Sequence, residues 1–160
     1  MSQQTSPLAN FLRFAICLTY FLGGILGLYV LLPATQGFLT SWLAMTLFGF
    51  MVGQNLVAIY GSITFFNNKA KGGRLLYWLS WTSVPVFSSE LISYHSIIGL
   101  GLVPMMSFDP KNYGMYVLFE YGYTGVLNWF PTYDSYQLGI NLVPLLFIGV
   151  IRQLINVNEA

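Results

Sequence analysis

Charged residues are scarce in this chain. Of its 160 residues, six are Lys or Arg and five are Asp or Glu, which is 7% of the total, whereas 56% are hydrophobic. Water-soluble domains have roughly 25% charged residues, so we do not expect a water-soluble fold. The net charge of +1 leaves no basic face that could neutralise a run of phosphates, which excludes nucleic acid as an expected partner. The expected partners are membrane lipid and other membrane proteins.

Cysteine and histidine are almost absent as well. Cys17 is the sole cysteine, which excludes an intrachain disulfide. His95 is the sole histidine, which is too few ligands for a zinc site or for a haem held by two histidines. The sequence also lacks a phosphate-binding glycine loop with Lys and the common hydrolase and metalloprotease motifs. It therefore predicts no cofactor and no metal.

Long apolar stretches make up most of the chain. Four of them approach the length of about 20 residues that a helix needs to cross a bilayer. They lie at about 11–32, 38–66, 75–100 and 137–154. We therefore expect a single domain of the all-α integral membrane class with four transmembrane helices. A fifth span at 113–130 is the alternative, but it would bury Glu120 and move Arg152 outside, and both consequences count against it.

The basic residues fall between these stretches in a pattern that predicts an orientation. Arg13 lies near the start of the first stretch, and Lys69, Lys71 and Arg74 separate the second from the third. Arg152 lies near the end of the fourth. Basic residues near the ends of spans mark the cytoplasmic side. We therefore expect both termini in the cytoplasm, and the short loops and low cysteine content favour a bacterial inner (plasma) membrane.

The segment 109–136, between the third and fourth stretches, is unusually aromatic. Large side chains alternate from 113 to 123, and this period of two favours a strand that turns back near Gly122 as a short β-hairpin. A short helix lying in the outer interface is the alternative. We predict that the segment is an extracytoplasmic docking cap. Its main contact residues are Tyr113, Phe119, Tyr121, Tyr123 and Trp129.

Glu90 is the first candidate for a functional site, because a carboxylate inside a membrane span is costly and by default marks a functional position. Pro85 can kink the helix nearby, Tyr94 follows at four residues, and His95 follows at five. One hypothesis makes Glu90 a proton- or cation-binding group in an outer polar pocket. The other makes it a structural acceptor that is bonded to Tyr94 or to a neighbouring helix.

Three amides inside the predicted spans also need partners. Gln54 and Asn55 lie in the second span and Asn141 in the fourth. We expect them to bond to one another across helices, or else to line a polar pathway with Glu90.

Two pairs of glycines four residues apart predict close helix packing. Gly23 and Gly27 lie in the first span, and Gly49 and Gly53 lie in the second. Glycines at this spacing flatten one helix face, so another helix of the same chain or of an oligomer can approach it closely.

Together these features favour a non-enzymatic membrane component. We expect a channel or transport component, or an accessory subunit of a membrane complex, that associates through its glycine-rich faces and its aromatic outer segment. The partner is a second copy of the chain or another membrane protein. The alternative is an intramembrane enzyme acting on a lipidic substrate with Glu90 as acid or base, but the sequence shows no positioned catalytic pair.

Overall fold

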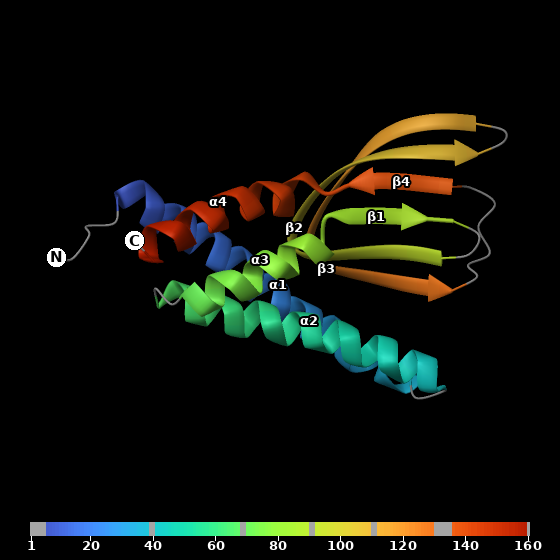
Figure 1. Ribbon diagram of the computed structural model, residues 1–160. Helices are drawn as coiled ribbons and strands as arrows, with labels where there is room; N and C mark the ends of the chain where they lie inside the picture. The colour runs from blue at the N-terminus through green and yellow to red at the C-terminus, as the bar shows by residue number, and fades with distance from the viewer. Residues whose placement is uncertain are drawn as a thin grey trace.

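The computed structural model describes residues 6–38, 41–67, 70–89, 92–109, 112–129 and 136–159. Four helices and four strands follow one another along the chain. They are α1 (Pro7–Phe38), α2 (Trp42–Phe66), α3 (Ala70–Thr82), β1 (Pro85–Ser88), β2 (Ile92–Asp109), β3 (Asn112–Trp129), β4 (Tyr136–Ile140) and α4 (Leu142–Glu159). The four helices come together toward the end of the molecule where both termini lie, and the sheet extends from the opposite end (Figure 1).

The expectation of an all-α fold with four transmembrane helices is wrong. The predicted third span, 75–100, is divided between α3, β1 and β2, because α3 ends at Thr82 and strands follow from Pro85. A continuous apolar run fits a buried strand as well as a helix, so its hydrophobicity alone could not distinguish them. Among the described residues, two helical segments are long and apolar enough to cross a membrane, Pro7–Pro33 and Trp42–Phe66. The apolar part of α4 is shorter.

The sheet is built on one long hairpin that bends in its middle. β2 and β3 pair antiparallel along all 18 residues of each strand. Gly99 faces Gly122 across this ladder, and their φ angles are +94° and +96°, a conformation that L side chains rarely adopt. A pair of glycines in this conformation lets both strands change direction together, so the hairpin has two arms.

The two short strands lie between these arms. β1 pairs with the first arm of β2 through Phe87 and Tyr94. β4 pairs with the second arm of β2, where Gly139 faces Met105, and the same Gly139 faces Val86 of β1. The strand order is therefore β1-β4-β2-β3 with an additional β1–β2 pairing. β1 and β4 thus fill the space between the two arms of β2, and β3 lies on the outer side of β2 along both arms.

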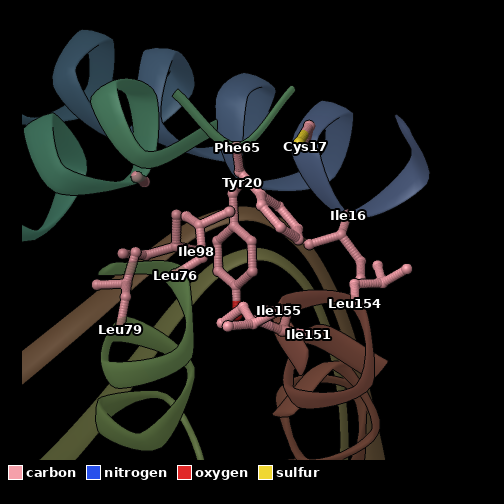
Figure 2. Close-up of a cluster of buried hydrophobic side chains, with 11 residues drawn as sticks. Ile16, Cys17, Tyr20, Phe65, Leu76, Leu79, Ile98, Ile151, Leu154 and Ile155 are labelled. Carbon is pink, nitrogen blue, oxygen red and sulfur yellow. The ribbon is translucent and has the colours of Figure 1, made fainter. Parts of the chain in front are cut away.

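The helical end has an apolar core that also contains a buried polar contact. Tyr20 of α1 points between α3 and α4, with Leu76 on one side and Ile155 on the other (Figure 2). Its hydroxyl forms a 2.7 Å hydrogen bond with the buried Ser80 hydroxyl. Phe65 of α2 lies in the same cluster. Tyr20 therefore joins three helices, and its polar atom is satisfied where it is buried.

Candidate functional site

A cavity of about 330 Å³ lies between the arms of the bent hairpin. Its polar lining residues are Ser88, Ser93, His95, Glu120 and Gln137. The apolar residues that complete the lining are Val86, Phe87, Met105, Leu118 and Val126. Every strand of the sheet contributes to this lining, so the cavity exists because the hairpin is bent. We call it the sheet cavity.

Strand geometry explains why His95 and Glu120 meet there. Alternate residues of a strand point to the same face, so His95 shares a face of β2 with Gly101, and Gly101 is paired with Glu120 of β3. The two residues lie on different arms, and the bend brings them together. His95 Nε2 and Glu120 Oε2 are 3.6 Å apart, which is the distance of an ion pair and too long for a hydrogen bond.

The protonation of His95 reflects its position in the cavity. Its side chain is 15% exposed, and that of Glu120 is 25% exposed. Burial lowers the pKa of His95, and the Glu120 carboxylate offsets part of this effect. Burial therefore favours the neutral form of the imidazole. His95 Nε2 and Glu120 Oε2 are both buried and have no hydrogen bond within the described residues. Together they can therefore form hydrogen bonds with a small polar molecule.

The sequence singles out His95 as a candidate, but it does not identify Glu120 as its partner. Glu120 was assigned to an outer loop, and no local pattern could pair it with a residue 25 positions earlier. The signal that would have found it is the register of β2 against β3, which requires that 92–109 be recognised as a strand. Glu90, the main sequence-based candidate, lies outside the described residues.

Tyr94 and Gln54 belong to a second polar cluster, which joins the sheet to the helices. The Tyr94 hydroxyl donates to the Thr82 carbonyl at 2.5 Å. Gln54 Nε2 donates to Thr82 Oγ1 at 3.1 Å, and Ser96 Oγ donates to Gln54 Oε1 at 3.2 Å. Burial raises the pKa of Tyr94, and these neighbours partly offset the shift. Gln54 therefore connects α2 with α3 and β2.

The other two amides occupy separate positions. Asn55 Nδ2 donates to the Met51 carbonyl within α2 at 2.8 Å. Asn141 precedes α4, and its Oδ1 accepts from Val143 N at 3.3 Å and from Leu102 N at 3.1 Å. Asn141 thus caps α4 and fixes its start to β2. In the part of the chain that the structure describes, the three amides do not share one pathway.

The two glycine pairs have different surroundings. A Cβ added at Gly23 would overlap the backbone of Gly99 in β2, and one added at Gly27 would overlap the Asn55 amide. The pair in α1 therefore packs inside the chain. A Cβ at Gly49 or Gly53 would meet nothing within 4 Å, so the described residues leave the pair in α2 uncovered.

The predicted docking segment is strand β3, and its partner is β2. Tyr113, Phe119 and Tyr121 are 79%, 70% and 78% exposed. Tyr123 instead packs against the helical core, and burial raises its pKa to about 12, although the Asn55 side chain partly offsets this. The Trp129 side chain lies outside what the structure describes. The predicted residues therefore divide, since three lie on the surface and one lies inside.

One face of the sheet is apolar and exposed across β4, β2 and β3. Alternate residues of β3 lie on it, together with the residues of β2 and β4 that the register places beside them. These residues are Leu100, Leu102, Met106, Phe108, Tyr113, Met115, Val117, Phe119, Tyr121, Tyr136, Leu138 and Ile140. We call this surface the outer apolar face. The inner face of the sheet is mixed, since the apolar cluster of Val86, Ile97, Val103 and Met105 lies beside the polar residues of the cavity, whereas the outer face is apolar.

Comparison with known proteins adds no assignment. No protein-family model, curated protein sequence or solved structure matches this chain. Within the described ranges, no three His, Cys, Asp or Glu side chains gather into a group that could hold a metal ion. The two surfaces of the sheet and the helices that carry it are therefore the features that bear on function.

Proposed function

We propose that this chain is a non-enzymatic subunit of a membrane complex, held in the bilayer by α1 and α2 and assembled through its sheet. The outer apolar face carries this proposal, because it exposes twelve large apolar side chains on three adjacent strands. Soluble monomers rarely expose contiguous apolar patches larger than a few hundred Å². A surface of this kind needs lipid or protein to cover it.

The surfaces of α1 and α2 support the membrane anchor. Length and hydropathy alone do not separate a transmembrane helix from the core helix of a soluble protein. A core helix is mostly buried, however, whereas the apolar windows of α1 and α2 are 39% and 22% buried. Their exposed side chains include Leu22, Ile25 and Val30 of α1 and Phe50 and Leu56 of α2. These side chains suit contact with lipid.

The distribution of basic residues supports one orientation. The starts of α1 and α3 and the end of α4 lie at the same end of the molecule (Figure 1). Arg13, Lys71, Arg74 and Arg152 belong to these segments. Because basic residues favour the cytoplasmic side, we propose that this end faces the cytoplasm of a bacterial inner membrane. The sheet then extends toward the opposite side.

The anchor can be tested with a charge at Ile25, which is exposed near the middle of the α1 span. We expect wild-type protein to stay in the membrane pellet after an alkaline carbonate wash. Ile25→Arg should lower the pelleted fraction, because Arg near the centre of a span costs about 2.5–3.5 kcal/mol. Ile25→Ala is the matched control and should stay in the pellet. Release of the wild-type chain by the wash would contradict the anchor.

A further inference from the structure

β3 has a long edge without a partner in the described part of the chain. It pairs with β2 on one side and stands last in the strand order. Open edges are templates for pairing with another chain, and proteins usually protect them with Lys, Pro or a bulge. Residues 113–121 of β3 contain neither Lys nor Pro, and their sole charged residue is Glu120, which points into the sheet cavity. In lipid, such an edge must be paired.

We propose that this edge pairs with the same edge of a second copy of the chain, antiparallel, across a two-fold axis at Val117. The inference rests on the proposed assembly role of the sheet. The available segment lies between the hairpin end at Asn112 and the bend at Gly122. Val117 is its midpoint. Full overlap of two such segments pairs Val117 with Val117, Tyr113 with Tyr121 and Met115 with Phe119.

This register makes the two copies complementary. Odd residues face odd residues, so the outer apolar faces of the two copies become one surface, and a shift by one residue would destroy this continuity. The aromatic pairs that result are of a kind that stabilises sheets. Glu120 falls opposite Gly114 of the other copy, so the two carboxylates lie six positions apart, about 20 Å along the strand. The charges therefore do not oppose the pairing.

A foreign partner is less favoured by the same residues. Specific recognition by another protein uses complementary charge or an anchoring pocket. The edge offers no charge to an outside partner, because Glu120 is turned into the cavity. The edge instead offers alternating large apolar side chains and backbone N–H and C=O groups without a partner among the described residues. A second copy of the same strand is complementary to both.

Cross-linking in native membranes tests the pairing. Facing residues of antiparallel strands have Cα atoms about 4.5–5.5 Å apart, within the range that a disulfide spans. We expect Val117→Cys to form, on mild oxidation, a reducible species of twice the 18.0 kDa chain mass. Wild-type protein should not form it, because its Cys17 is 4% exposed. Resistance to proteolysis equal to that of wild type checks that the variant folds.

The matched control is Leu138→Cys. Leu138 lies on the same outer apolar face and is 57% exposed, close to the 63% of Val117, but β2 separates its strand from β3. We expect no cross-link from it. Equal cross-linking of the two variants would mean that the faces stack and the edges do not pair, which overturns the inference.

Two further substitutions test the register. Tyr113→Cys and Tyr121→Cys should each give no cross-link alone and a strong one when the two chains are co-expressed. A folded, membrane-bound Val117→Cys chain without cross-link overturns the edge pairing and leaves the anchor intact. A chain that cross-links at position 117 but is released by carbonate overturns the anchor and leaves the pairing intact.

Discussion

The helical end and the sheet both have apolar clusters inside, but they differ in how their polar groups are buried. At the helical end the buried Tyr20 and Ser80 hydroxyls bond to each other, and the buried Arg13 guanidinium lies over the Phe65 ring, 5.4 Å from its centroid. In the sheet, His95 and Glu120 face the interior while Phe119 lies on the outside. Apolar groups turn away from water. The outside of the sheet therefore carries the kind of side chain that fills the core at the helical end.

The boundary between the two regions is built from close backbone contact and one polar cluster. Gly23 of α1 lies against the backbone of Gly99, at the bend of the hairpin. Gln54 bonds to Thr82 and to Ser96 across three elements. The bend is therefore both the feature that forms the sheet cavity and the place where the sheet is attached to the helices. Substitutions there should have the largest effects.

Among substitutions at the boundary between the helical end and the sheet, Gly99→Ala is expected to reduce stability the most. Its Cβ would lie 2.5 Å from Thr19 Cγ2 and 2.7 Å from the Thr19 carbonyl oxygen, in addition to the positive φ. We expect a loss of about 3–5 kcal/mol in unfolding free energy from strain and overlap together. Gly122→Ala shares the φ but meets its nearest neighbour at 3.6 Å, so about 1–2 kcal/mol is expected. Denaturant unfolding in detergent micelles measures both.

Gly114→Ala is the control for this series. Gly114 has no positive φ, and its Cβ would meet nothing within 4 Å. A change within about 0.5 kcal/mol is expected, as at most surface positions. If Gly99→Ala were no worse than Gly114→Ala, the bend would not hold the sheet as described.

The next largest effect is expected at the contact between α1 and the sheet. Gly23→Ala should cost about 2–3 kcal/mol, because its Cβ overlaps the Gly99 backbone and a backbone cannot step aside as a side chain can. Gly53→Ala, in open space on α2, should instead raise stability by up to about 1 kcal/mol, since Ala favours helix over Gly. Thermal unfolding followed by circular dichroism distinguishes these signs. A destabilising Gly53→Ala would mean that another chain packs on that face.

The sequence predicted α1 and α2 better than it predicted the sheet. Both helices lie within long apolar stretches, and local hydropathy suffices to identify them. The alternation from 113 to 123 also predicted a strand, and β3 covers it. The prediction that residues 92–100 belong to a helical span is wrong, because β2 has apolar residues on both faces. Ile97 and Val103 fill the interior while Leu100 and Leu102 lie outside, so the alternation that marks a strand is missing.

The candidate site was harder to predict for a physical reason. His95 and Glu120 come together through strand register and the bend at Gly99, and both are long-range properties that no local pattern encodes. The three amides were recognised as needing partners, but their partners come from turns and strands that were expected to be helix. Where the fold class is wrong, single residues can still be selected, but their neighbours cannot.

The smallest expected effect concerns the polar interior of the sheet and depends on pH. Burial lowers the pKa of His95 in the folded chain below its usual value of 6.5. As pH falls through 6.5, the unfolded chain takes up a proton that the folded chain does not bind, so the fold loses stability until the pH is below the folded pKa. His95→Gln should remove this part of the acid dependence. Unfolding midpoints between pH 7.5 and 5.0 measure it.

Glu120→Gln separates the pair from the rest of the cavity. The Glu120 carboxylate favours the charged imidazole, so its removal lowers the pKa of His95 further and widens the gap from the unfolded value. Glu120→Gln should therefore lose more stability than wild type on acidification, whereas His95→Gln should lose less. If both variants flattened the profile equally, His95 would be charged in the fold, and the sheet interior would be wetter than its burial indicates.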